Sequence, residues 1–196
     1  TIMAEELRRF ADALEGADDH NAALHTLIVD SLTKHQRILF NGNGYDESWV
    51  QEAARRGLAN LRSAPEAFST YMSDKIVALF TGHHVFTKAE MQARDEIHFE
   101  SYCKKIQIEA LTMAVMVRRQ ILPAAMAYSA QLCEAIGSKK QAEISCTVET
   151  ASARRVTELT EALYDGVSKL EDALRQLPAG EVSQLAAYYH DTVLRA

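Results

Sequence analysis

The sequence predicts an all-α protein, and three observations support that prediction. Apolar residues recur every three or four positions along most of the chain, which is the spacing of one helix face. The segment from Lys88 to Ile136 contains no glycine, so it predicts a helix of about 49 residues and roughly 70 Å. No stretch shows a strand-like alternation of useful length. We therefore expect a long antiparallel helical hairpin at about 88–177, packed with several shorter N-terminal helices and one C-terminal helix.

Short helices are expected in the N-terminal segment, residues 1–87. The first should end at Gly16, and Asp18 or Asp19 should cap the second. Their apolar stripes are Met3, Leu7, Phe10 and Leu14, and then Leu24, Ile28, Leu32, His35 and Leu39. On this register a second apolar set, Leu27, Ile38 and Phe40, points away from those faces. His35 lies on the apolar stripe, so we interpret it as a core histidine rather than a metal ligand.

A Phe-Asn-Gly-Asn-Gly-Tyr run at 40–45 interrupts the helical pattern. Asn-Gly pairs permit positive φ angles, which predicts a helix end and a tight turn. A phosphate-binding loop is the alternative, because clustered glycines free backbone N–H groups to face anions. The run lacks a preceding strand and a following Gly-Lys-Ser/Thr, so the turn is favoured.

Two further short helical segments should follow this run. Asp46 should cap a helix at 47–56, with Trp49, Val50 and Ala53 facing inward. Ser63 should cap the next element, which has Pro65 in its first turn. That element should carry one apolar face as far as Gly82, made of Phe68, Met72, Ile76, Leu79 and Phe80.

The long helix should open with a capping box between Thr87 and Glu90 and stop at Gly137. Pro123 should kink it near Arg119. Its apolar second half, in which we place Val115 in the seam, needs a partner helix. Met113, Met116 and Met126 could form a soft ligand surface, but we expect them to fill the core.

The partner should be Thr147 to Leu177, joined to the first helix by a polar connection at 138–146. Its stripe is Val156, Leu159, Leu163, Val167, Leu170, Leu174 and Leu177. After a turn at Pro178–Gly180, a last helix from Glu181 to Arg195 should place three residues inward, namely Leu185, Tyr189 and Val193. Residues 88–196 thus form the second segment, and we expect the two segments to fold as one unit.

Composition disfavours several partners. The net charge is −6 and no basic cluster is interleaved with aromatics, so we expect no nucleic-acid partner. The longest uncharged apolar run of the long helix, Gln120 to Cys133, is too short to cross a bilayer, so we expect no membrane partner. Three scattered cysteines and the lack of a signal peptide suggest reduced thiols in the cytoplasm. The start at Thr1, directly in a helical pattern, suggests a piece of a longer protein.

Catalytic motifs are not evident. His83, His84 and His98, with Asp95 one turn before His98, could suggest a metal site. A di-iron bundle needs two Glu-x-x-His pairs and two more carboxylates, whereas this chain has one Asp-x-x-His. A solvated helix face explains these residues better. We therefore assign no catalytic, cofactor-binding or metal-binding residue.

Several motifs nevertheless resemble the C-terminal part of type III glutamine synthetases. They are the run from Phe40 to Tyr45 followed by Trp49, then Glu52–Leu61, Leu79–Phe80, Val85–Thr87 with Glu90, Ala93–Arg94, Ile108–Thr112 and Gln120–Ala124. The resemblance covers Thr1 to Ile136, and beyond Gly137 it rests on helical character alone. Asp46, Ala59 and His84 stand where the family pattern suggests serine, proline and glycine.

The resemblance implies a parent enzyme that ligates ammonia to glutamate with ATP and Mg or Mn. The family's catalytic residues match no position here, so the isolated chain should be inactive. Its expected role is packing and assembly, against an upstream catalytic domain and neighbouring subunits of a homo-oligomer. The surplus apolar residues of the N-terminal helices should pack on that domain. The alternative is a free-standing all-α interaction module, and the coding frame upstream of Thr1 would separate the two.

Overall fold

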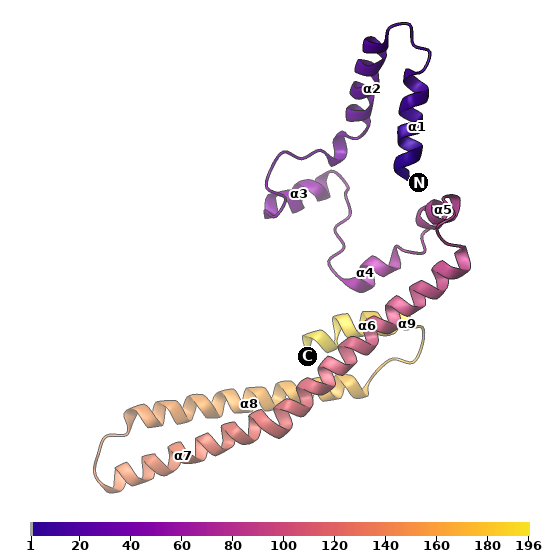
Figure 1. Ribbon diagram of the computed structural model, residues 1–196. Coiled ribbons are helices and arrows are strands. Elements are labelled where there is room, and N and C mark those ends of the chain that lie inside the picture. Colours follow the sequence, from indigo (N-terminus) through magenta and orange to yellow (C-terminus); the bar gives the residue numbers. More distant parts are fainter. Residues whose placement is uncertain (1) are drawn as a thin grey trace. The chain divides into compact units, whose positions relative to one another are not determined.

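The computed structural model describes residues 2–196, and within that range every regular element is helical (Figure 1). The all-α prediction is therefore confirmed. The helices fall into two compact units. The first comprises the residues up to 62 together with 73–88, and the second comprises 63–72 and 89–196.

The first unit opens with a hairpin of two helices, α1 (Ile2–Leu14) and α2 (His20–Lys34). Gly16 takes the left-handed conformation that ends α1, with a φ of 82°. The Asp19 carboxylate accepts a 3.0 Å hydrogen bond from the Ala22 N–H, so Asp19 is the cap of α2. A 3-10 turn, Gln36–Ile38, follows α2.

The register expected for α2 is wrong. Leu24, Ile28 and Leu32 are exposed, whereas Leu27, expected to point away, is half-buried. Leu27 lies between Ala23 and Ser31 on one row, and these small residues allow a neighbouring helix to approach closely. His35 is exposed, so it is not a core histidine.

Two more helices belong to the first unit, α3 (Glu47–Arg55) and α5 (Asp74–Gly82). The Asp46 carboxylate caps α3 by accepting from the Ser48 N–H at 3.0 Å, as expected. Ala53 is 7% exposed, and it is the one residue among 2–62 and 73–88 that is buried. This unit therefore has very little core of its own.

The single element expected from Ser63 to Gly82 is two helices. α4 (Ala64–Ser69) lies in the second unit and opens with a Ser63–Glu66 capping box. The chain leaves the helix at Thr70, whose hydroxyl donates to the Ala67 carbonyl at 2.8 Å. The extended Ser73 then begins α5. The apolar spacing continues through this break, because Phe68, Met72 and Ile76 recur at every fourth position across it.

The second unit is built on one continuous 54-residue helix, paired with a second helix (Figure 1). The long helix consists of α6 (Lys88–Met116), a π-helical turn (Val117–Ile121) and α7 (Leu122–Gln141). α8 (Thr147–Arg175) returns antiparallel to α7, which confirms the hairpin. The chain ends with α9 (Val182–Asp191) and a 3-10 turn, Val193–Arg195.

The predicted disturbance near Arg119 is the π turn, in which the Leu122 N–H bonds to the Val117 carbonyl. Pro123 has no N–H and its ring would clash with the Arg119 carbonyl in a regular α-helix, so a wider turn accommodates it. The expected stop at Gly137 is wrong, since α7 runs on to Gln141. Glu143, with a φ of 57°, takes the left-handed position that follows the helix end.

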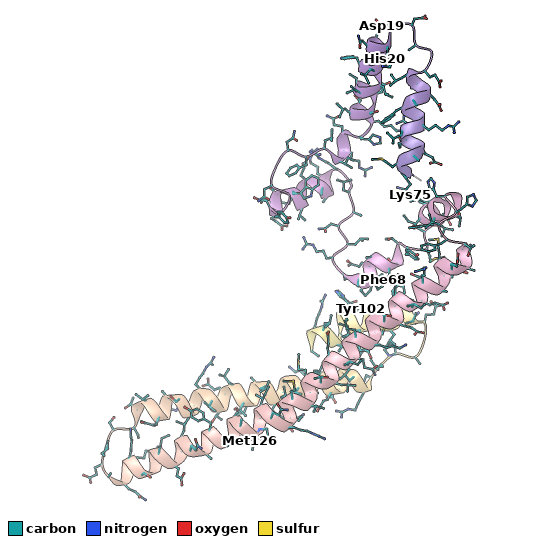
Figure 2. The ribbon with its side chains drawn as sticks, in the orientation of Figure 1. Asp19, His20, Phe68, Lys75, Tyr102 and Met126 are labelled. Carbon is teal, nitrogen blue, oxygen red and sulfur yellow. The ribbon has the colours of Figure 1, made fainter. Side chains whose placement is uncertain are left out.

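Two clusters form the core of the second unit. The larger joins α6, α8 and α9 and contains Phe99, Cys103, Ile106, Ala110, Leu170, Ala173, Ala186, Tyr189 and Val193. Phe68 of α4 packs against it (Figure 2). The smaller contains Ala114, Val117, Leu122 and Val167. Tyr189 and Val193 face inward as predicted, with exposures of 1% and 3%.

The seam of the hairpin differs from the prediction at several positions. Val115 is 49% exposed, and Ala114 and Val117 occupy the contact line. Met113, Met116 and Met126 are also exposed, so they do not fill the core. Figure 2 labels Met126. The register was misjudged because alanines, which allow close helix contact, carry little weight in an apolar pattern.

Candidate functional site

The histidines do not assemble into a metal site. His83 and His84 lie in the first unit, whereas Asp95 and His98 lie on α6 in the second. Among residues 2–196, no group of three or more His, Cys, Asp or Glu side chains could hold a metal ion. His98 stacks on the Phe68 ring, with 5.3 Å between ring centroids.

Asp95 departs from the expected solvated face. Its Oδ1 is buried without a hydrogen-bond partner, and burial raises the pKa of the carboxyl group. His84 and His98 are exposed, in agreement with the expectation. Asp95 therefore differs from a solvated carboxylate on the α6 surface.

The loop at 40–45 is held by aromatic and arginine side chains. The Phe40 and Trp49 rings lie 4.2 Å apart between centroids, and the Arg56 guanidinium lies 5.7 Å from the Trp49 centroid. Arg56 donates to the Leu39 carbonyl at 2.6 Å. Arg37 in turn donates to the Arg56 and Gly57 carbonyls. These two arginines bind backbone oxygens and so fasten the segment before the loop to the end of α3.

The glycines of this loop serve a purpose other than the one expected. None of Asn41–Gly44 has a positive φ angle, so that part of the turn prediction is wrong. The Phe40 ring folds over Gly42: a Cβ there would lie 2.5 Å from Phe40 Cζ, so a larger residue would require the ring, which packs on Trp49, to move. The Tyr45 N–H donates to Asn43 Oδ1 at 3.1 Å, and the Tyr45 side chain is fully exposed.

A salt bridge that was not foreseen links the π turn to α8. Arg118 donates to both carboxylate oxygens of Glu171, at 3.1 and 2.8 Å, and to the Ser168 hydroxyl at 2.9 Å. Its guanidinium also lies 4.5 Å from the Tyr164 ring centroid. Residues 118 and 171 are 53 positions apart, so local sequence pattern carried no signal for this contact.

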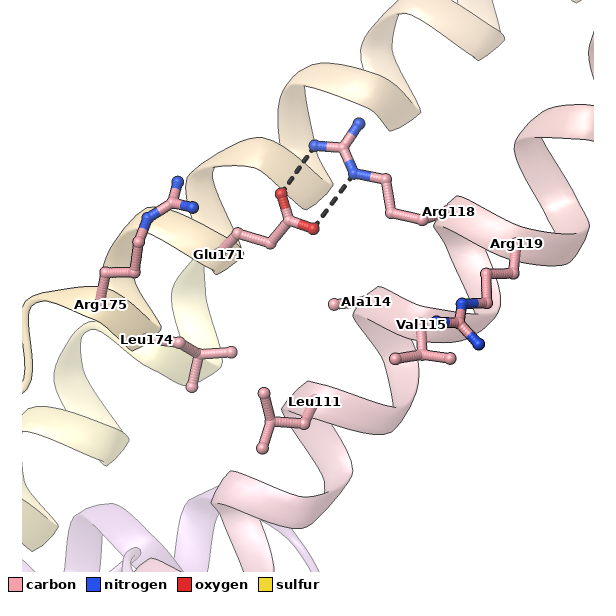
Figure 3. Close-up of a pocket in the computed structure, with 8 residues that line it drawn as sticks. All are labelled: Leu111, Ala114, Val115, Arg118, Arg119, Glu171, Leu174 and Arg175. Carbon is pink, nitrogen blue, oxygen red and sulfur yellow. Dashed lines mark hydrogen bonds and ion pairs between the residues drawn. The ribbon is translucent and has the colours of Figure 1, made fainter.

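Next to this salt bridge lies a groove between α6 and α8, with a volume of about 440 Å³ (Figure 3). Apolar side chains form its floor, and Leu111 and Leu174 point toward one another across it. Its full lining is Leu111, Ala114, Val115, Arg118, Arg119, Glu171, Leu174 and Arg175. The lining includes three arginines: Arg118 is paired with Glu171 of the lining, and Arg175 is paired with the neighbouring Asp172.

Both units carry many exposed large apolar side chains. In the first unit they lie mainly on α1 and α2, where Met3 is 73% and Leu7 60% exposed. In the second unit they surround the end of α6 and the start of α7: Ile108, Leu111, Met113, Val115, Met116, Ile121 and Met126. A helix that is apolar all round is normally buried in its functional state.

The three cysteines are free thiols in different surroundings. Cys103 is buried, and desolvation raises the pKa of its thiol, whereas Cys133 is exposed. No helix within residues 2–196 has the length and apolar character that crossing a bilayer requires.

Comparison with known proteins gives a consistent result. The family model for the glutamine synthetase C-terminal domain matches residues 23–140. A glutamine synthetase of Butyrivibrio fibrisolvens is 37% identical over 180 residues, which cover 90% of this chain and 26% of the relative. A type-3 glutamine synthetase of Dictyostelium discoideum is 37% identical over 141 residues, which cover 70% of this chain and 19% of the relative.

A glutamine synthetase of Bacteroides fragilis is 30% identical over 179 residues, which cover 89% of this chain and 24% of the relative. The chain thus spans about a quarter or less of the length of these curated relatives. The family match extends over more than half of the chain and includes the loop at 40–45, α3 and the long helix. The chain therefore belongs to the glutamine synthetase C-terminal domain family.

Proposed function

We propose that this chain is the C-terminal helical region of a type III glutamine synthetase, and that it acts in packing and assembly without catalytic residues of its own. The parent reaction would be the ATP-dependent ligation of ammonia to glutamate, with Mg or Mn held by another part of the enzyme. The observation that carries the proposal is the extent of exposed apolar surface on a chain of this family.

The energetic argument is direct. Each Leu or Ile left in water forfeits on the order of 1.5–3 kcal/mol of burial. Large exposed apolar patches commonly mark interaction surfaces. The first unit has one buried residue among those described, so contacts with other surfaces would supply most of its stabilisation. An upstream catalytic domain and neighbouring subunits of a homo-oligomer would supply them, in the cytoplasm, where free thiols persist.

The absence of catalytic groups is tested with the isolated chain. Phosphoryl transfer from ATP requires metal ions that clamp the phosphate oxygens, and such sites need converging carboxylates. We expect no glutamine from glutamate, ammonia, ATP and Mg or Mn when only residues 1–196 are present. Glutamine formation by the purified chain, abolished by a metal chelator, would contradict the proposal.

The packing role is tested by supplying the two parts separately. When the region upstream of Thr1 is produced alone, we expect it to be less stable than the joined enzyme. Addition of residues 1–196 as a separate polypeptide should restore part of that stability and form a stoichiometric complex. No binding between the two parts would favour the free-standing interaction module, as would a start codon directly upstream of Thr1.

A further inference from the structure

The groove of Figure 3 combines an apolar floor with a rim that carries arginines. Its floor is apolar, with Leu111 and Val115 each 49% exposed. Its rim carries Arg118, Arg119 and Arg175. Arg118 is paired with Glu171 and Arg175 with Asp172, so within residues 2–196 Arg119 is the rim arginine for which no ion pair is seen. A complementary ligand therefore needs apolar side chains beside a negative charge that faces Arg119.

The size of the groove suits side chains of a helix. Its volume of about 440 Å³ exceeds that of one aliphatic side chain. Two side chains one helical turn apart lie about 5–6 Å from each other, which matches the Leu111–Val115 spacing on the floor.

The same chain carries a segment with this complementary chemistry. α2 exposes Leu24, Ile28 and Leu32 in one row. Residues 1–35 hold seven carboxylates against three basic residues, a formal charge of −4 out of −6 for the whole chain. Glu15 and Asp18 lie in the connection between α1 and α2, which precedes the helix that carries the apolar row.

We propose that the groove binds the α1–α2 hairpin of a second copy of the chain. Leu24 and Ile28 enter the apolar floor, and Glu15 and Asp18 face Arg119. The inference rests on the proposed assembly role and specifies one contact within it.

Charge also disfavours the symmetric alternatives. Two grooves placed face to face would bring the two Arg119 guanidiniums together, and two hairpins face to face would bring their carboxylates together. A groove-to-hairpin contact joins different surfaces on the two copies. Such head-to-tail contacts either close into rings or continue as open chains.

Mixing two defective variants of the full chain tests this directly. Ile28→Asp removes the apolar row and leaves the groove, whereas Val115→Asp removes the groove floor and leaves the row. Both residues are 49% exposed, so neither change should unfold the chain, and circular dichroism verifies this. We expect each variant alone to associate at least tenfold more weakly than the unmodified chain in sedimentation velocity. A mixture should form a one-to-one complex that stops at two copies, because one intact groove meets one intact row.

Further variants distinguish specific docking from non-specific hydrophobic association. Val148→Asp changes an apolar residue of α8 that is 74% exposed and lies outside the groove, so association should stay unchanged. Arg119→Glu and Glu15→Arg should each weaken association, and the two together should restore it. An unmodified chain that stays monomeric at about 100 µM, or a mixture that stays monomeric, would overturn the proposal. So would charge reversals without effect.

Failure of this contact would not remove the assembly role. The catalytic portion of the enzyme could still cover both surfaces, and the separate-polypeptide experiment described above would still show binding.

Discussion

His84 is a non-glycine residue with a backbone conformation that favours glycine. It follows the end of α5 with a φ of 54°, and the Val85 N–H closes the turn on the Phe80 carbonyl at 3.0 Å. This is the position at which helices favour glycine, and it is also where the family resemblance suggests glycine.

We expect His84→Gly to stabilise the first unit by about 0.5–1 kcal/mol, because glycine carries no steric cost at positive φ. Glu143→Gly, at a φ of 57° after α7, should stabilise the second unit similarly. The matched control is His25→Gly inside α2, which should destabilise because glycine is a poor helix former. Thermal denaturation measures all three, and destabilisation by His84→Gly would contradict the backbone assignment.

Glu52 provides a pH-dependent contact beside the sole tryptophan. Hydrogen bonds from Arg55 and then Arg56 lower the pKa of Glu52 to about 2. A lowered folded-state pKa means that Glu52 stabilises the fold fully above about pH 4.5, and that this contribution is lost as the pH falls toward 2. Trp49 packs against Phe40 and Arg56, so its fluorescence should change over that range. Glu52→Gln should remove that change, and an unaltered titration in the variant would contradict this account.

The cysteines should differ in reactivity. Thiolate is the reactive form, so burial and a raised pKa protect Cys103 while exposed Cys133 reacts. With a thiol reagent at neutral pH, we expect Cys133 to be modified first and Cys103 last, after unfolding. Mass spectrometry of the modified peptides gives the order, and early labelling of Cys103 would show that the α6–α9 core opens readily.

At the scale of elements, the hairpin seam makes a clear prediction. Val117 is 5% exposed and Val115 is 49% exposed, although both lie near the end of α6. Val117→Asp would bury an unpaired carboxylate and should cost about 3–5 kcal/mol. Val115→Asp should change the stability of the monomer by less than about 0.5 kcal/mol. Equal effects in chemical denaturation at low protein concentration would show that the seam has a different register.

The positions of the helices could largely be predicted from the sequence, because capping residues and helix-breaking residues act locally. Asp19, Asp46 and Ser63 accept backbone N–H groups as expected, and Pro123 coincides with a π turn. It was harder to predict which face of each helix is buried. Ala110 and Ala114 line the contact, yet alanine is compatible with either side of a helix. Gly137 failed as a stop because packing of the hairpin outweighs a propensity cost of about 1 kcal/mol.

At the scale of the whole molecule, the long-range features lay beyond sequence pattern. The groove depends on Arg118 and Glu171, which meet only because α8 folds back along the long helix. The exposure of Met113, Met116 and Met126 likewise depends on which side α8 covers. The family, by contrast, could be predicted from the sequence, because the run at 40–45 and the segment around Ile108 are motifs specific to that family.

The N-terminal hairpin of α1 and α2 exposes apolar side chains on both helices. Met3 and Leu7 are exposed on α1, and Leu24, Ile28 and Leu32 are exposed on α2. In dilute, monomeric chain we expect fast amide exchange in residues 2–16, because little packing protects them. Association should slow that exchange. Strong protection of α1 in a monomeric sample would mean that the first unit closes its own core.

The mass of the complete enzyme tests the central claim most directly. The double substitution Ile28→Asp and Val115→Asp changes two exposed positions. Neither position has a described contact that would give it a catalytic role. Measured by light scattering after gel filtration, the doubly substituted enzyme should have a smaller mass than the unmodified enzyme at the same concentration. An unchanged mass would contradict the groove-to-hairpin contact. An unchanged mass accompanied by loss of glutamine formation would contradict the assembly role as well, because it would place this region in the chemistry that we propose for the rest of the protein.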